Sequence, residues 1–238
     1  KQQTHSSLRE FLLEETYESL EALDEADYPK LCQELGDLLL QILLHSQIAA
    51  ENGEFELEDV LKTISSKLIR RHPHVFGSLQ VETADEVSHN WEAIKKEERG
   101  DQKSMLESVP RQMPALAYSM DIQRRVQQVG FDWENTQGVI DKLVEEVNEL
   151  RQAQNQAERA DEFGDMLFTL VNVARRLGLD PEAALRQANR KFFHRFAYME
   201  KLCRERGLDL GKLSFEKQNK LWDEAKRGVK KEIRNKKS

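Results

Sequence analysis

Residues 28–53, YPKLCQELGDLLLQILLHSQIAAENG, contain the pattern that decides the fold. Proline stands at the second position, where it favours a helix start, and Asn52-Gly53 is a typical helix stop. Between these signals, leucine and isoleucine recur at intervals of three and four residues, which places them along one side of an α-helix. The stretch therefore predicts a long, largely buried helix.

Similar helical patterns cover most of the chain. In the first half they predict helices at about residues 7–23, 58–69 and 83–99, with capping boxes at Ser7/Glu10 and Thr83/Glu86. In the second half they predict helices at about residues 115–129, 137–152, 159–177, 181–206 and 214–226. We therefore predict an all-α fold of two tandem helical bundle domains, residues 1–99 and 115–238, joined by a polar linker at residues 100–114 that contains Pro110.

Composition excludes several classes of protein. The net charge of −7 and the pI near 5.5 argue against general affinity for nucleic acid, whose phosphates select basic surfaces. The longest apolar run is far shorter than the ~20 residues that cross a bilayer, so no membrane segment is expected. Residues 1–7 lack the apolar core of a secretory signal, and we expect a cytoplasmic protein whose two cysteines are reduced.

The strongest functional signal is an internal repeat of acidic residues. The pattern of residues 13–18 (LEETYE) and 34–39 (ELGDLL) recurs at residues 144–149 (VEEVNE) and 162–167 (EFGDML). Carboxylates three residues apart lie on one helix face, so two such helices packed antiparallel bring four carboxylates together, and this cluster requires a cation. The predicted metal ligands are Glu15, Glu18, Glu34 and Asp37 in the first half and Glu146, Glu149, Glu162 and Asp165 in the second.

The predicted ligands are oxygen atoms alone, which select hard cations. We expect Mg²⁺, with Mn²⁺ as the alternative. In a chain with 43 acidic residues one such pair arises by chance, whereas two ordered pairs in each half do not. Gly36 and Gly164 support the prediction, because a glycine inside a helix costs ~1 kcal/mol relative to alanine and indicates the close approach of another helix or a ligand.

Basic and aromatic residues extend the prediction from metal to substrate. Lys191 and Arg195 share a helix face and are predicted to hold phosphate oxygens that the metal does not reach. Trp222, with Lys226 one turn later, is predicted to stack on a nucleotide base, although core packing is the alternative for any tryptophan. The same spacings recur in the first half at Lys67, Arg71, Trp91 and Lys95.

These motifs, together with residues 70–76 (RRHPHVF) and 129–133 (VGFDW), resemble the MazG family of nucleoside triphosphate pyrophosphohydrolases over nearly the whole chain. The resemblance implies two MazG-like helical domains, homodimers, a requirement for Mg²⁺, and cleavage of nucleoside triphosphates to monophosphate and pyrophosphate in control of the nucleotide pool. It also implies the metal, phosphate and nucleotide contacts given above.

Two features of the resemblance favour the second half. In at least some tandem relatives only the second domain is active, and the Cys-Pro-Trp-Asp segment that members usually carry before Gln3 is not in this sequence. We therefore expect the working site at Glu146 and its partners. The expected chemistry is attack of a metal-activated water on the α-phosphorus, with Glu145 as the base that takes its proton.

Two alternatives stay open at this stage. A di-iron carboxylate bundle needs two Glu-x-x-His pairs, and only Glu86 with His89 has that spacing. A non-catalytic helical interaction module would carry acidic faces that are merely solvated, and it would release no pyrophosphate from any nucleoside triphosphate. The sequence defines no preference among bases or between ribose and deoxyribose.

Overall fold

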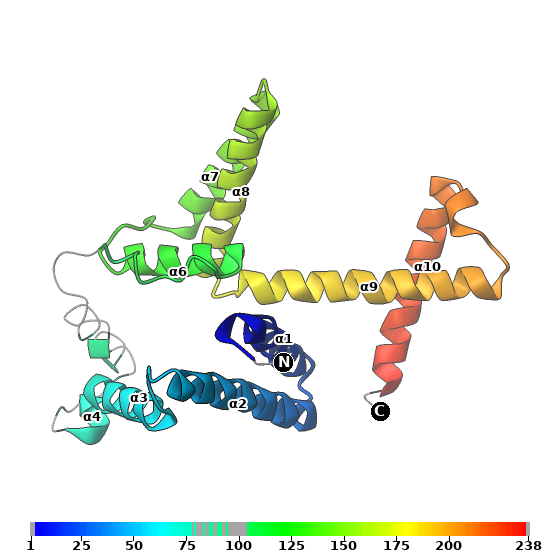
Figure 1. The fold of residues 1–238 in the computed structure, drawn as a ribbon. Coiled ribbons are helices and arrows are strands. Elements are labelled where there is room, and N and C mark those ends of the chain that lie inside the picture. Colours follow the sequence, from blue (N-terminus) through cyan, green and yellow to red (C-terminus); the bar gives the residue numbers. More distant parts are fainter. Residues whose placement is uncertain are drawn as a thin grey trace. The chain divides into compact units, whose positions relative to one another are not determined.

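The computed structural model describes residues 3–77 and 104–236, with a few isolated positions between them and the backbone alone beyond residue 231. Every regular element in these residues is a helix, which confirms the all-α prediction (Figure 1). The chain divides into two units, residues 1–107 and 108–238, and the division falls inside the stretch predicted as a linker. Each unit is described by itself.

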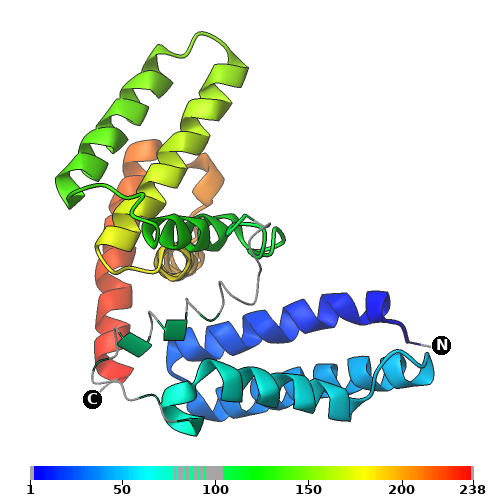
Figure 2. The same cartoon turned by 90° about the vertical axis from the view of Figure 1, so that its left-hand side faces the viewer.

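Unit 1 is built on a helical hairpin. It contains α1 (His5–Glu25), α2 (Tyr28–Glu51), α3 (Leu57–Arg71) and the short α4 (Pro73–Phe76). Two residues, Ala26 and Asp27, connect α1 to α2, so the two helices pack side by side and antiparallel (Figures 1 and 2). The Asp27 side chain accepts a hydrogen bond from the Lys30 N–H at 3.0 Å and so caps α2, whose predicted start and stop are confirmed.

Two predictions about this hairpin were wrong. The capping box of α1 joins Thr4 and Ser7, each of whose side chains accepts a hydrogen bond from the other's backbone N–H, so the helix begins at His5 and before the predicted start. In addition, α2 is not largely buried within one chain, because α1 covers only one of its faces. The exposed apolar residues of α2 are Tyr28, Leu35, Leu39, Leu40, Ile42 and Leu43.

Part of the first half lies outside the described residues. This applies to Lys95, to His89 and to most of the helix predicted at residues 83–99. At the start of that stretch the Glu86 N–H donates to Thr83 Oγ1 at 3.2 Å, which is the predicted cap.

Unit 2 repeats the hairpin and adds helices at both ends of it. Its elements are α6 (Ala115–Gln127), α7 (Thr136–Gln152), α8 (Gln156–Arg176), α9 (Pro181–Glu205), the 3₁₀ turn η1 (Leu210–Lys212) and α10 (Phe215–Lys236). The helices α7 and α8 lie side by side, α6 packs against α8, and α9 leads away from the hairpin and carries α10 (Figures 1 and 2).

The helices of unit 2 begin where the sequence provides caps. Asn135, Asn155 and Asp180 each accept a hydrogen bond from a backbone N–H in the first turn of α7, α8 and α9. The predicted end of the last helix at Lys226 was wrong, since α10 continues to Lys236. Its continuation includes Gly228, against whose backbone the Tyr198 ring of α9 packs directly.

The main buried cluster of unit 2 joins α9 to α10. It consists of Met199, Leu202, Cys203, Leu221 and Ala225. None of the described helices is long and apolar enough to cross a membrane.

Candidate active site

The hairpin of unit 2 brings three predicted metal ligands together. Glu146 projects from α7 and meets Glu162 and Asp165 of α8, with one carboxylate oxygen from each residue within 4.8 Å of the others. Glu146 is buried, Glu162 is half-buried and Asp165 is exposed. A site that is closed on one side and open on the other can hold a cation and still admit a second ligand.

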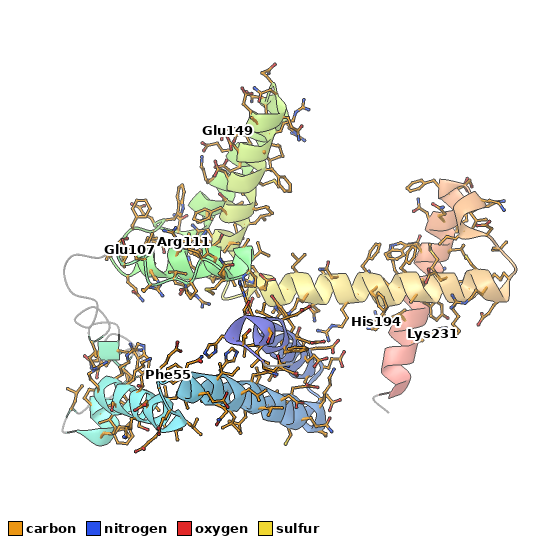
Figure 3. The ribbon with its side chains drawn as sticks, in the orientation of Figure 1. Phe55, Glu107, Arg111, Glu149, His194 and Lys231 are labelled. Carbon is orange, nitrogen blue, oxygen red and sulfur yellow. The ribbon has the colours of Figure 1, made fainter. Side chains whose placement is uncertain are left out.

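Glu149, the fourth predicted ligand, lies one turn further along α7 (Figure 3). Glu149 is outside the group of three carboxylates, but its negative charge acts on Glu162. The pKa of Glu162 is raised above its ordinary value, first by burial and then by the negative charges of Glu149, Glu146 and Asp165. Mutual repulsion of this kind would be relieved by a bound cation, and the metal at this cluster stays a prediction.

Lys142 lies one turn before Glu146 and was not predicted as a site residue. Its Nζ lies 2.7 Å from Glu145 Oε1 and 2.9 Å from Glu146 Oε1. These two hydrogen bonds raise the pKa of Lys142 above its ordinary value, so the amine stays charged. Glu145, the predicted base, is exposed and held by this lysine. The spacing of four residues between Lys142 and Glu146 is a signal that would have identified the pair.

A pocket of about 730 Å³ opens beside Glu146 and Asp165. This volume is within the range of ligand pockets, roughly 300 to 1,000 Å³. Beyond the carboxylates its walls come from α6, α8 and the loop between α6 and α7. The residues that give these walls their character are Gln123, Phe131, Trp133, Phe168, Asn172 and Arg175.

A buried ion pair fixes the loop that carries Trp133. Asp132 accepts hydrogen bonds from the guanidinium of Arg175 on α8 and from the backbone N–H of Trp133, the latter at 2.9 Å. Burial opposes ionisation of Asp132, but the hydrogen bonds from Arg175 and Trp133 outweigh it and lower the pKa of this carboxyl. The VGFDW segment at residues 129–133 is thus anchored to α8 and forms one wall of the pocket.

The structure of one chain does not bring the predicted phosphate ligands to this site. Lys191 and Arg195 lie on α9, which leads away from the α7/α8 hairpin, and neither is among the described residues that line the pocket (Figure 1). Lys191 is exposed and Arg195 is half-buried.

The predicted nucleotide contacts of unit 2 also lie elsewhere. The half-buried Trp222 packs against the α9/α10 core, with its ring centroid 5.1 Å from that of Phe192. Lys226 forms an ion pair with Asp223 at 2.9 Å. Core packing, the alternative named for Trp222, is therefore what the structure of one chain shows.

Unit 1 contains a second carboxylate cluster. Glu15 and Glu18 of α1 and Glu34 of α2 each place an oxygen within 4.8 Å of the others. The pKa of Glu15 is raised, first by burial and then by Asp37, the fourth predicted ligand. Burial and the charge of Glu18 likewise raise the pKa of Glu34.

Among the predicted substrate contacts of unit 1, two lie together. The Arg71 guanidinium lies over the Trp91 ring at 5.4 Å from its centroid, and Lys67 is half-buried one turn earlier on α3. This arrangement brings a cation and an aromatic ring to one place, and their contact with a substrate stays a prediction.

Gly36 and Gly164 were expected to allow the close approach of a helix or a ligand. A Cβ added at either position would meet no atom within 4 Å in the described chain. Among the described residues, no other helix of the chain is therefore the reason for these glycines.

Comparison with known proteins agrees with this arrangement. A sequence model of the MazG nucleotide pyrophosphohydrolase domain matches residues 3–76, and one of phosphoribosyl-ATP pyrophosphohydrolase matches residues 117–192. The nucleoside triphosphate pyrophosphohydrolase/pyrophosphatase MazG of Thermotoga maritima is 46% identical over 229 residues, which cover 96% of this chain and 88% of the relative.

Two further relatives are similar over the same span. The nucleoside triphosphate pyrophosphohydrolase of Escherichia coli K12 is 44% identical over 234 residues, covering 95% of this chain and 89% of the relative. The uncharacterised protein YabN of Bacillus subtilis is 46% identical over 231 residues, covering 95% of this chain and 47% of YabN. The chain therefore belongs to the MazG family of nucleoside triphosphate pyrophosphohydrolases.

Proposed function

We propose that this chain is a Mg²⁺-dependent hydrolase that cleaves nucleoside triphosphates to monophosphate and pyrophosphate, with unit 2 as the working site. The observation that carries the proposal is the convergence of Glu146, Glu162 and Asp165 beside a pocket large enough for a nucleotide. The names of the relatives support the substrate class. A cytoplasmic location and a role in control of the nucleotide pool go with this activity.

The residues of the cluster fit Mg²⁺. They are carboxylates from two rigid helices, and the metal group of unit 2 contains neither histidine nor cysteine. Glu146, Glu162 and Asp165 would hold the ion, with Glu149 at its edge, and Mn²⁺ is the alternative. When bound, the ion neutralises triphosphate charge and lowers the pKa of a coordinated water.

The side chains around the cluster have separate tasks in this mechanism. Glu145 is proposed to take the proton of the attacking water, at the carboxylate that Lys142 now holds. Lys142 keeps Glu146 oriented and places a positive charge where the phosphate chain enters the pocket. Arg175 and Asp132 hold the loop wall in place, which positions the substrate between the cluster and Trp133.

We propose that the functional form is a homodimer. In one chain α8 exposes Phe163, Leu167 and Leu170, and α9 exposes Phe192 and Phe193 beside Lys191. A group of exposed apolar side chains on neighbouring turns of a helix is unfavourable in water and is typical of a protein interface. Dimerisation would cover it and would complete the site with the phosphate contacts from Lys191 and Arg195.

Pyrophosphate release tests the proposal. The protein is incubated with each common ribo- and deoxyribonucleoside triphosphate, with Mg²⁺ or with a chelator, and the products are separated. We expect monophosphate and pyrophosphate with Mg²⁺ and no turnover with the chelator. No turnover of any substrate would instead favour the interaction module, and release of single phosphate would mean a hydrolase that cleaves a different bond of the triphosphate.

A second candidate substrate is phosphoribosyl-ATP, because the family match over residues 117–192 is to the hydrolase of that compound. It contains the same type of phosphoanhydride bond. Including it in the panel decides the point, since a kcat/KM for phosphoribosyl-ATP well above that for every triphosphate would identify it as the substrate.

A further inference from the structure

The pocket of unit 2 contains a buried hydrogen-bond acceptor without a partner. Gln123 of α6 is only 3% exposed, and its Nε2 donates to the backbone oxygen of Phe168 at 2.9 Å. Because only the amide nitrogen can donate to a carbonyl, the other end of the side chain is the oxygen. This Oε1 is buried and has no hydrogen-bond partner among the described residues.

An unpaired buried acceptor is unfavourable in any protein, and it calls for a specific reason. Gln123 is one of the residues that line the pocket, so a ligand bound there would lie beside its side chain. A ligand that donates a hydrogen bond to Oε1 removes the cost. The acceptor therefore indicates the chemistry of the group that this part of the pocket receives.

The walls around Gln123 are suited to a flat ring. Phe131 and Trp133 come from the loop that Asp132 and Arg175 anchor, and Phe168 comes from α8. Aromatic faces of this kind stack on nucleotide bases without regard to their identity. Trp222, to which the sequence assigned stacking, is packed on the α9/α10 core in one chain, whereas Trp133 lies on the pocket wall.

The two ends of the pocket are ordered along α8. Asp165, Thr169 and Asn172 follow one another at helical spacing on the face that lines it, and Phe168, which holds Gln123, lies about one turn from Asp165. Arg175, which anchors the loop with Phe131 and Trp133, lies ten residues, about 15 Å, beyond Asp165 on α8. The carboxylates and the aromatic loop are therefore separated along this helix, and Gln123 lies between them. A nucleotide has the same order, with phosphates at one end and a base at the other.

We propose that the part of this pocket beside Gln123 receives the base of the substrate, and that Gln123 Oε1 accepts a hydrogen bond from an N–H group of that base. The inference rests on the proposed function and adds to it a residue that recognises the nucleoside. Adenine and cytosine offer an exocyclic amino group, and guanine and uracil offer ring N–H groups. The acceptor therefore distinguishes bases that have such a donor from rings that lack it.

Substrate analogues that lack the donor test this inference. ATP is compared with purine riboside triphosphate, which lacks the 6-amino group, and CTP with the analogue that lacks the 4-amino group. For the wild type we expect kcat/KM to fall roughly 5- to 10-fold on loss of the amino group, the range of one neutral hydrogen bond. In Gln123→Met, which keeps the length of the side chain without the acceptor, the ratio should fall to about one.

The ratio separates recognition from a structural effect. Gln123→Met also loses the hydrogen bond to Phe168, but that loss changes both substrates of a pair alike. Gln127→Met is the matched control, because Gln127 is exposed one turn later on α6 and should keep the wild-type ratio. The wild-type ratio needs no variant, so it tests the inference even if Gln123→Met does not fold.

Four outcomes would overturn the inference. A wild-type ratio near one, or a ratio that Gln123→Met leaves unchanged, removes the base contact while triphosphate hydrolysis stands. If Gln123→Met instead changes the ratio of ATP to its 2′- or 3′-deoxy analogue, the acceptor faces the sugar. If the wild type hydrolyses no triphosphate, the proposed function fails first, and this result is distinct from the others.

Discussion

The two units carry the same acidic pattern on the same kind of hairpin, yet they assemble their clusters differently. In unit 1 the first helix supplies two carboxylates and the second supplies the buried one, Glu34. In unit 2 the first helix supplies the buried one, Glu146, and the second supplies the other two. The motif thus places acidic residues at a hairpin, but it does not determine which of them is buried.

A lysine one turn before the buried glutamate accounts for part of this difference. Lys30 precedes Glu34 on α2, and its charge opposes the rise in the pKa of Glu34, while Lys142 precedes Glu146 on α7 and contacts it. When the two repeats are aligned in sequence, Phe11 corresponds to Lys142 and Glu158 corresponds to Lys30. Each unit therefore has the lysine only on the helix that carries its buried carboxylate. A buried negative charge needs such a neighbour.

The largest expected effect comes from removing the buried carboxylate of each unit in turn. Glu146→Ala should lower kcat/KM for pyrophosphate release by about 1,000-fold, which corresponds to ~4 kcal/mol, because the site loses a group that holds the cation. Glu34→Ala should leave kcat/KM within about 2-fold, since we assign the chemistry to unit 2.

Circular dichroism and sedimentation of both variants show whether they fold and assemble as the wild type does. Glu15→Ala provides a second probe of unit 1. If either unit 1 variant abolished turnover while Glu146→Ala did not, the assignment of the working site to unit 2 would be wrong.

The next effect concerns the ion pair that shapes the pocket of unit 2. Asp132→Asn removes a buried charge and leaves Arg175 without its counter-ion, which should cost about 3 kcal/mol of unfolding free energy. The pKa of Asp132 is lowered in the folded state, so its contribution is complete above the unfolded value of 3.8 and is lost as pH falls through the folded value. The difference between wild type and variant should therefore shrink below about pH 4.

Urea unfolding followed by Trp133 and the other tryptophans at several pH values measures this difference. Asp223→Asn is a matched control, because Asp223 pairs with Lys226 on an exposed face, where solvent screens the ion pair, and its loss should change the stability little. A difference between wild type and Asp132→Asn that is constant down to pH 2 would contradict the role of this ion pair.

The sequence predicted the helices and the acidic clusters because both depend on local spacing. Leucine and isoleucine at intervals of three and four residues mark α2, and the acidic pairs mark one face of each hairpin helix. The spacing of residues within each helix was enough to predict these features. The start of α1 at His5 was missed because Ser7 is as good a cap by residue type as Thr4, and only backbone geometry separates them.

The wall of the pocket was not predicted because it depends on contacts between distant segments. Gln123 meets Phe168, and Asp132 meets Arg175, across 45 and 43 residues of sequence. The spacing of residues along the sequence does not predict contacts between such distant segments. In the sequence the resemblance alone marks the VGFDW segment at residues 129–133, and only the fold places it on the pocket wall.

A smaller effect is expected where α10 crosses α9. A Cβ at Gly228 would overlap the Tyr198 ring, so Gly228→Ala should lower the unfolding free energy by about 1 to 3 kcal/mol despite the better helix propensity of alanine. Thermal unfolding measures this. The double variant with Tyr198→Ala should recover much of the loss, and no recovery would mean that the ring is not the obstacle.

The smallest effects return to the comparison of the two units. Alanine at Gly36 or Gly164 meets no atom of the described chain, so by helix propensity alone each substitution should raise the unfolding free energy by up to ~1 kcal/mol. The two should differ in activity, because Gly164 precedes the cluster residue Asp165 and we expect substrate or a second chain to approach it. Gly164→Ala should then lower kcat/KM several-fold and Gly36→Ala should leave it unchanged, as pyrophosphate release with both variants would show. Equal activities would mean that neither substrate nor a second chain comes close to the α8 glycine.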